Sequence, residues 1–195
     1  MKPLKIFTDG GCSDNQSDEN FGGWGAVLIY GEHEKKMSGG ERNTTNNRME
    51  LTALLRALEA IKKDGLNVEV YSDSAYLVKC FRDKWYANWL RNGWKNAGKK
   101  PVENQDLWKA IIPYLKKHRI EFYIVKGHVN LNSKKLDIDS LFNDFLKKNE
   151  GRFALGDFKY IIEMNNAADS LASGGIEAVK LFDPSVDGDE RMENR

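Results

Sequence analysis

Alternating apolar and polar positions near the start of the chain predict β-strands. From Gly22 to Tyr30, a set of Trp, Ala, Leu and Tyr side chains alternates with a set of Gly, Val and Ile, which is the two-residue period of a strand. Leu4 to Thr8 fits a second strand, and Gly31 to Arg42 fits a third, weaker one. Because the connections between them are short, an antiparallel meander is favoured.

The period then lengthens to that of a helix. Apolar residues recur at helical spacing from Leu54 to Ile61, so we predict a helix that starts near Thr45 to Asn47 and ends at Gly65. The pair Gly174-Gly175 is expected to end the last helix. The order of elements indicates an α/β domain with a mixed sheet of about five strands. The other predicted elements are a strand at Asn67 to Asp73, helices at Ser74 to Phe81 and Asp106 to Lys117, a strand at Ile120 to Lys126, and helices at Ile138 to Asn149 and Phe158 to Ser173.

Length and composition fit a soluble globular protein. Of its 195 residues, 41% are apolar and 30% are charged, and a chain of this size buries roughly 70% of the surface that it exposes when unfolded. No apolar run is long enough to span a bilayer, and residues 1–8 lack the apolar stretch of a signal peptide. We therefore expect a cytoplasmic protein without membrane contact, in which Cys12 and Cys80 are reduced thiols that bind no metal.

The net charge of +1 conceals two segments of opposite sign. Residues 79–119 hold 11 lysines or arginines and 3 acids, which suits a polyanionic partner. Residues 183–195 hold 5 acids and 2 arginines without apolar periodicity, and we expect them to form a disordered acidic tail. The remainder, residues 1–182, is expected to be a single domain.

Four acids stand at positions that could bring them together. Asp9 and Asp73 each end a predicted strand, Glu50 shares the apolar stripe of its helix with Leu54, and Asp169 lies in a helix of small residues. If the two strands are parallel, both aspartates lie at one edge of the sheet, where α/β proteins bind ligands. Each acid also has an ordinary explanation, which in chain order is turn chemistry, the helix dipole, helix capping and a solvated helix surface.

Convergence of the four carboxylates would require cations. Two carboxylates about 4 Å apart repel by roughly 4 kcal/mol at an effective dielectric constant near 20, so a cluster must hold either protons or cations. Oxygen ligands without cysteine or histidine select hard ions such as Mg²⁺, with Mn²⁺ as a substitute. Two such ions bridged by one aspartate would suit the cleavage of a phosphodiester bond.

Five short motifs form a combination that is specific to one family. In chain order they are Thr8-Asp9-Gly10, Thr45-Asn46-Asn47-Arg48-Met49-Glu50-Leu51, Ser72-Asp73-Ser74, Val125-Lys126-Gly127-His128, and Asn165 through Asp169-Ser170-Leu171-Ala172. Together they resemble type 1 ribonuclease H, from about Lys5 to Ala172. The resemblance implies the ribonuclease H-like fold, an α/β fold with a mixed five-stranded sheet and helices on both faces.

The same resemblance implies an activity. The family cleaves the RNA strand of an RNA–DNA hybrid with two Mg²⁺ ions and leaves 3′-hydroxyl and 5′-phosphate ends. It implies that His128 assists proton transfer or product release, although a solvated loop histidine is the ordinary alternative. The implied metal ligands, with the first as the bridge between the ions, are Asp9, Glu50, Asp73 and Asp169.

The basic segment at residues 79–105 resembles the protrusion with which the family grips the DNA strand. Phosphate contacts supply affinity, and aromatic faces suit sugars or bases. Two of its tryptophans, four residues apart, could instead pack on each other. The implied contacts of the protrusion are Trp85, Trp89, Trp94, Lys95, Lys99 and Lys100.

Further nucleic-acid contacts are implied outside the protrusion. Thr45 and Asn104 match a pocket for a DNA phosphate, and Asn15, Asn46 and Asn47 match contacts to the minor groove of the hybrid. Recognition of this kind reads the shape of the duplex and its 2′-hydroxyl groups, so we expect little sequence preference.

Three features depart from the family. Ala75 stands where a glutamine commonly contacts the RNA, and the loop at residues 14–19 is acidic. Residues 129–164 form an insertion, before the last helix, where the family has a short loop. Its apolar stripe from Ile138 to Leu146 predicts a helix that either packs on the domain or forms a lid or a surface for an unknown partner. We expect the insertion to alter turnover or product release.

The sequence favours a monomeric, Mg²⁺-dependent hybrid ribonuclease, with two alternatives left open. One is a hybrid-binding protein whose catalysis is weakened by the insertion and the acidic loop. The other is a different nuclease on the same fold. Tight binding of hybrid without cleavage would identify the first, and cleavage of duplex DNA would identify the second.

Overall fold

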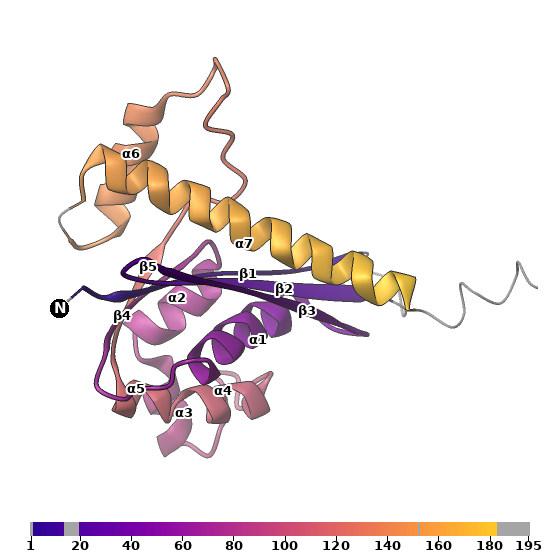
Figure 1. Ribbon diagram of the computed structural model, residues 1–195. Helices are drawn as coiled ribbons and strands as arrows, with labels where there is room; N and C mark the ends of the chain where they lie inside the picture. The colour runs from indigo at the N-terminus through magenta and orange to yellow at the C-terminus, as the bar shows by residue number, and fades with distance from the viewer. Residues whose placement is uncertain (1, 14–19, 152, 183–195) are drawn as a thin grey trace, which may run out of the picture.

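The structure is a computed structural model, and it describes residues 2–13, 20–151 and 153–182 (Figure 1). The predicted contact at Asn15, the acidic loop at residues 14–19 and the acidic tail at residues 183–195 lie outside the described residues. Within the described ranges, the helices are all too short or too polar to cross a membrane.

Five strands form one mixed sheet at the centre of the fold. They are β1 (Leu4–Ser13), β2 (Phe21–Tyr30), β3 (His33–Arg42), β4 (Asn67–Ser72) and β5 (Arg119–Ile124). Their order across the sheet is β3-β2-β1-β4-β5. The first three pair antiparallel, whereas β4 runs parallel to both β1 and β5. The predicted meander and the mixed sheet are therefore confirmed.

Helices cover both faces of this sheet (Figure 1). One face carries α1 (Asn46–Glu59), α2 (Ala75–Arg82), α3 (Trp85–Arg91), α4 (Gln105–Ile111) and α5 (Tyr114–Lys117). The other face carries α6 (Ile138–Lys148) and α7 (Leu155–Leu181). Since side chains alternate along a strand, Ile6 enters the apolar core under α1, and Phe7 enters the core under α7.

α1 is shorter than predicted. Thr45 caps its N-terminus, because its side chain accepts a backbone hydrogen bond from the first turn. The helix ends at Glu59. Just beyond this residue, the Ile61 amide donates to the Leu58 carbonyl, three residues back, and not to a carbonyl four residues back as in an α-helix. The predicted end at Gly65 is wrong because this glycine, at a φ of +75°, belongs to the turn that leads into β4.

The predicted helix from Asp106 to Lys117 is divided into α4 and α5. Pro113 stands directly before α5, and its nitrogen has no hydrogen to donate to the preceding turn. Trp108 and Ile111 of α4 are nevertheless fully buried in the core beside α1. The apolar stripe is thus real, although the helix that carries it is interrupted.

α7 continues past its predicted end at Gly174-Gly175. Gly175 does not stop the helix but lets it approach the sheet, since a Cβ there would lie 2.2 Å from the Gly39 carbonyl oxygen. On β2, a Cβ at Gly23 or Gly25 would lie 2.0 or 2.1 Å from a carbonyl oxygen of α7. These glycines therefore serve close packing of helix on sheet.

The insertion packs on the domain. Phe145 of α6 is 3% exposed, and its ring centroid lies 4.9 Å from that of Phe153 and 5.1 Å from that of Phe158. Asn149, directly after α6, pairs with the free edge of β5: its Oδ1 accepts from the Ile124 amide, and its Nδ2 donates to the Ile124 carbonyl. These contacts favour the packed interpretation of α6 over a free lid.

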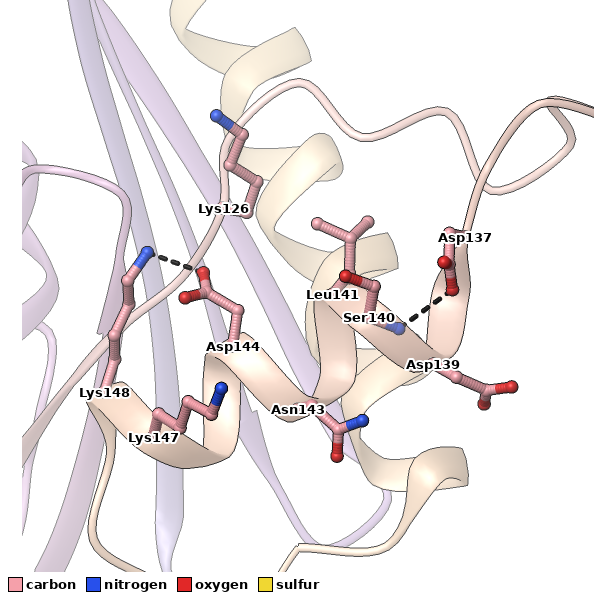
Figure 2. Close-up of a pocket in the computed structure, with 9 residues that line it drawn as sticks. All are labelled: Lys126, Asp137, Asp139, Ser140, Leu141, Asn143, Asp144, Lys147 and Lys148. Atoms are coloured by element: carbon pink, nitrogen blue, oxygen red, sulfur yellow. Dashed lines mark hydrogen bonds and ion pairs between the residues drawn. The ribbon is translucent and has the colours of Figure 1, made fainter.

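The outer face of α6 borders an open cleft of about 800 Å³ (Figure 2). Asp137 caps the helix by accepting a hydrogen bond from the Ser140 amide, and Lys148 pairs with Asp144 at 2.6 Å. Three lysines and three aspartates line the cleft. Because the opposite charges balance, the cleft favours neither an anion nor a cation.

Candidate active site

Asp9 lies inside β1 and does not end it. β1 continues to Ser13 along β2, whereas its parallel pairing with β4 stops where Thr8 lies opposite Ser72. The prediction that the strand ends at Asp9 is wrong for this reason. Asp9 and Asp73 each follow the last residue of the parallel pairing between β1 and β4, so this pairing places both acids at the same point of the sheet.

A close approach of α1 brings Glu50 to this point. A Cβ at Gly10 would lie 2.3 Å from the Glu50 backbone nitrogen, so a larger residue would push α1 away from β1. Glu50 lies near the N-terminus of α1 on its buried side, among residues such as Met49 and Leu54. Its position on the apolar stripe therefore points it inward, as the sequence predicts.

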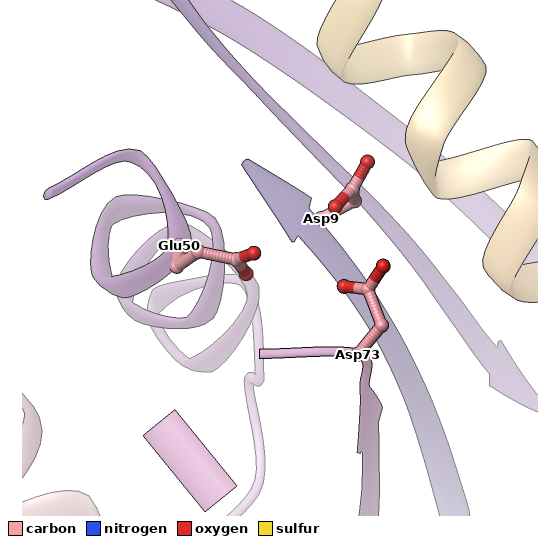
Figure 3. Close-up of side chains that lie close together, drawn as sticks. All are labelled: Asp9, Glu50 and Asp73. Carbon is pink, nitrogen blue, oxygen red and sulfur yellow. The ribbon is translucent and has the colours of Figure 1, made fainter. Parts of the chain in front are cut away.

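The carboxylates of Asp9, Glu50 and Asp73 face one another (Figure 3). One oxygen from each lies within 4.8 Å of the others. Asp9 is 8% exposed, and Glu50 is 7% exposed. Among the described residues, Glu50 Oε2 finds no hydrogen-bond partner. A buried carboxylate oxygen without a partner is costly, which makes the cluster a candidate cation site.

Asp169 and His128 complete the group. The carboxyl of Asp169 is within hydrogen-bonding reach of that of Asp9, and its Oδ2 lies 3.2 Å from His128 Nδ1. A Cβ at Gly127 would lie 2.0 Å from Asp73 Oδ2, so the loop that carries His128 also touches the carboxylate cluster. The structure thus brings all five predicted catalytic residues to one place.

Burial and mutual repulsion raise the pKa values of the clustered carboxyl groups. Burial is the largest cause for Asp9, whose pKa is raised to about 7, and the charge of Asp73 adds to it. The pKa of Glu50 is raised well above its ordinary value, first by burial and then by the charge of Asp9. Burial also raises the pKa of Asp73, although His128 opposes this shift. Without a cation, the cluster retains protons near neutral pH.

Comparison with known proteins identifies the family. Residues 1–144 match the model of the RNase H family. The chain belongs to the ribonuclease H family. It is 56% identical to the ribonuclease H of Syntrophomonas wolfei over 128 residues, 66% of this chain and 86% of that protein. It is 48% identical to the ribonuclease H of Acetivibrio thermocellus over 149 residues, 76% of this chain and 98% of that protein.

Solved structures share the ribonuclease H fold with this chain. LC9-RNase H1, a type 1 RNase H with the type 2 active-site motif, has a TM-score of 0.58 at 21% identity. The similarity covers 86% of this chain and 86% of that one. The RNase H domain of PFV has a TM-score of 0.60 at 24% identity, over 90% of this chain and 94% of that one. The structure of LC11-RNase H1 with an RNA/DNA hybrid has a TM-score of 0.52 at 18% identity, over 91% of this chain and 99% of that one.

The residues at the ribonuclease H site fit hard divalent cations. The donors that face one another are carboxylate oxygens, which Mg²⁺ and Mn²⁺ prefer. The unpartnered Glu50 Oε2 supplies a buried lone pair. Burial and the neighbouring carboxylates raise the pKa values of Asp9 and Glu50, and a cation bound between them would offset this repulsion. The family match ends within α6, so the placement of Asp169 in this set comes from the structure.

Arg48 joins the two residues of the expected phosphate pocket, and the sequence did not single it out. Its Nη1 donates to Asn104 Oδ1 at 3.4 Å, and its backbone amide donates to the Thr45 hydroxyl. The guanidinium also pairs with Asp106 at 2.8 Å and with Glu41 at 3.0 Å. Its place in the Thr-Thr-Asn-Asn-Arg-Met-Glu motif was the only signal that pointed to it.

The residues expected at the minor groove start α1. Asn46 and Asn47 are exposed in its first turn, next to Thr45. Ala75, which replaces the glutamine of the family, is exposed at the first position of α2, two residues after Asp73. Asn46, Asn47 and Ala75 are therefore accessible to a ligand.

The protrusion uses its tryptophans in different ways. Trp89 is only 8% exposed, and its ring packs at 5.2 Å from Trp108 and 6.4 Å from Trp94. Trp89 nevertheless lines the groove along the protrusion, so the expected nucleic-acid contact at Trp89 stays a prediction. Trp85 packs against Tyr76 at 6.4 Å, whereas the ring of Trp89 packs on Trp94 and Trp108, so the alternative in which Trp85 and Trp89 pack on each other is not favoured.

A groove of about 660 Å³ runs along the protrusion. Its lining includes Trp85, Asn88, Asn92 and Lys95, which combine an aromatic surface with amide and ammonium donors. Lys95, Lys99 and Lys100 are exposed. This combination suits a nucleic-acid strand, whose phosphates attract lysine and whose sugars and bases pack on aromatic rings.

Proposed function

We propose that the protein is an endoribonuclease that acts in the cytoplasm on the RNA strand of RNA–DNA hybrids and leaves 3′-hydroxyl and 5′-phosphate ends. The observation that carries the proposal is the convergence of Asp9, Glu50, Asp73 and Asp169 in a member of the ribonuclease H family. Buried carboxylates held together cost free energy, which a bound cation would offset.

The four carboxylates would hold two Mg²⁺ ions, or Mn²⁺ as a substitute. Asp9 has a carboxylate oxygen within 4.8 Å of one from Glu50 and one from Asp73, and it is within hydrogen-bonding reach of Asp169, so it would suit a ligand shared between ions. Ions bound there would lower the pKa of the attacking water and neutralise charge that develops on the scissile phosphate. Gly10 supports this arrangement by holding α1, and with it Glu50, against β1.

His128 suits a step that moves a proton or releases the product. Its side chain is 76% exposed, so it can reach a bound phosphate. Its Nδ1 lies 3.2 Å from Asp169 Oδ2, and this contact orients the ring so that Nε2 can face the substrate. Nε2 could then donate a proton to the leaving 3′-oxygen.

We propose that the hybrid lies across the carboxylates with its DNA strand on the protrusion. The solved structure of LC11-RNase H1 contains an RNA/DNA hybrid. Phosphate contacts would supply affinity, and contacts to 2′-hydroxyl groups would distinguish RNA from DNA. The accessible residues that support this placement are Thr45, Asn46, Asn47, Trp85, Lys95, Lys99, Lys100 and Asn104.

The proposal is tested by cleavage of end-labelled RNA–DNA hybrid, duplex RNA and duplex DNA with Mg²⁺, Mn²⁺ or a chelator. We expect cutting of the RNA in the hybrid alone, only with a metal, and a loss of about 10²-fold or more in Asp73→Asn because a metal ligand is weakened. Asp139→Asn is the matched control, since it removes an exposed acid of α6 beside the cleft of Figure 2.

Two outcomes would contradict the proposal. A folded protein that binds hybrid but cuts it with neither metal would be a hybrid-binding protein. Equal losses in Asp73→Asn and Asp139→Asn would show that total charge, and not the cluster, controls activity.

A further inference from the structure

The loop after β5 holds His128 in an unusual backbone conformation. Its φ is +54°, in the left-handed region that residues other than glycine rarely adopt. Such a conformation persists only where the surroundings determine it. The residues on either side of His128 should therefore be anchored.

Both neighbours of His128 are anchored. Gly127 presses on Asp73, where there is no room for a Cβ. Val129 is 6% exposed and lies in the apolar core with Phe145 and Phe158. The carbonyl oxygen of Val129 also accepts a hydrogen bond of 2.8 Å from Asn166 Nδ2 of α7.

Asn166 and Asp169 lie three residues apart on α7 and thus on the same face of the helix. One of them bonds the carbonyl that follows His128, and the other contacts His128 Nδ1. One turn of α7 therefore fixes both the backbone and the ring of the histidine. Both residues line a cavity of about 530 Å³ beside the carboxylates, together with His128.

The position of this hydrogen bond relates to the insertion. Val129 is the first of the 36 residues between His128 and Asn165 that we expect to be an insertion. A long connection leaves the chain more freedom beyond its anchor points. The bond from Asn166 ties the Val129 carbonyl to α7, directly after His128.

We propose that Asn166 is a positioning residue, which acts through His128 by holding the Val129 carbonyl. This inference rests on the proposed role of His128 in the reaction. Asn166→Ala removes the donor and so loosens the loop at the Val129 carbonyl, while the Gly127 contact and the buried Val129 side chain remain. We expect kcat on RNA–DNA hybrid to fall by about threefold to tenfold while KM changes less than about twofold, since the step affected follows binding.

Two comparisons separate positioning from a structural effect. Glu163→Ala is the control, because Glu163 is exposed and lines the same cavity one turn earlier on α7. It should leave kcat unchanged. In the background of His128→Ala, Asn166→Ala should cause no further loss of kcat, because its effect passes through the histidine.

The outcomes are distinguishable. If His128→Ala cuts as fast as the wild type, the proposed role of the histidine fails, and the inference fails with it. If His128→Ala is slow but Asn166→Ala alone is unchanged, Asn166 does not position the loop. If the two losses multiply in the double variant, or if Asn166→Ala lowers the melting temperature and KM rises in parallel, its effect is structural and the inference is overturned.

Discussion

At the scale of single residues, the site is defined by side chains placed against their own preference for water. Asp9 and Glu50 are almost fully buried, and Glu50 Oε2 lacks a partner within the described part of the chain. A protein that needed only stability would not keep this arrangement, because apolar residues would fit the same volume at lower cost. The metal-free protein should therefore show the cost directly.

The first prediction is that the metal-free protein loses stability as the pH rises, and that Asp9→Asn removes much of this loss. The folded-state pKa of Asp9, about 7, lies above the ordinary value of 3.8. The stability that Asp9 contributes through its raised pKa is thus fully present below about pH 4 and is lost as the pH rises through 7. At pH 8 we expect Asp9→Asn to be the more stable protein by at least about 1.4 kcal/mol, the equivalent of one pKa unit.

Thermal unfolding between pH 5 and pH 8 in a chelator measures this difference. Addition of Mg²⁺ should raise the melting temperature of the wild type and leave that of Asp9→Asn nearly unchanged. Asp139→Asn, at an exposed position of α6, should follow the wild type at every pH. Parallel pH curves for the wild type and Asp9→Asn would mean that the carboxylates do not repel one another in the folded state.

At the scale of elements, glycines decide where helices sit on the sheet. Gly10 lets α1 pack closely on the sheet, while Gly23, Gly25 and Gly175 let α7 do so. At each of these glycines a Cβ would meet backbone atoms. α7 carries Asp169, so the depth at which this helix packs sets the distance from Asp169 to the other carboxylates. Packing and catalysis are thereby coupled through backbone contacts.

The second prediction compares two adjacent glycines of α7. Gly175→Ala should destabilise the protein by about 1–3 kcal/mol, because its Cβ would collide with the Gly39 carbonyl of β3. By tilting α7 it should also lower kcat, by about tenfold or more if Asp169 moves by 1 Å. Gly174→Ala is the control: its Cβ would meet no atom within 4 Å, so alanine should stabilise the helix by about 0.5–1 kcal/mol.

Chemical denaturation and steady-state cleavage of hybrid test the second prediction. If Gly175→Ala were as stable and as active as Gly174→Ala, the contact between α7 and β3 would be loose, and the position of Asp169 would depend on other contacts.

The same elements show what sequence can and cannot predict. The strands and the inward direction of Glu50 follow from periodicity, which is local. The role of Gly175 does not follow from periodicity, because a glycine that ends a helix and a glycine that lets a helix touch a sheet look alike in sequence. Trp89 is ambiguous for a related reason: an aromatic residue in a basic segment suits both a nucleic-acid strand and a core, and in the structure Trp89 packs on Trp108 and also lines the groove of the protrusion.

At the scale of the whole molecule, the insertion is part of the folded domain. Its aromatic residues join the core above the sheet, where Phe153 packs against Tyr123 of β5 at 5.3 Å. Arg82 of α2, on the opposite face of the sheet, donates to the Phe122 and Lys148 carbonyls. The insertion is thus tied to both layers across the free edge of β5, which it also protects from pairing with other chains.

The third prediction is that α6 unfolds together with the sheet in the wild type. In Asn149→Ala, we expect α6 to unfold independently of the sheet. Asn149 is 4% exposed and bonds both polar groups of Ile124 as well as the Phe145 carbonyl. Alanine keeps the bond from its backbone amide to the Phe145 carbonyl but leaves the Ile124 amide and carbonyl without the Asn149 side chain, at a cost of about 2–3 kcal/mol. The loss should be local to α6, because the pairing of β4 with β5 does not depend on Asn149.

Native-state hydrogen exchange resolves this prediction along the chain. In the wild type, the amides of α6 and β4 should exchange with similar opening free energies, as members of one cooperative unit. In Asn149→Ala, the protection of α6 should fall by more than that of β4, while Asn143→Ala, an exposed position of the same helix, should change neither. If α6 already opens on its own in the wild type, the insertion is only loosely attached. In that case a moving α6, and not a fixed one, would account for any effect of the insertion on turnover.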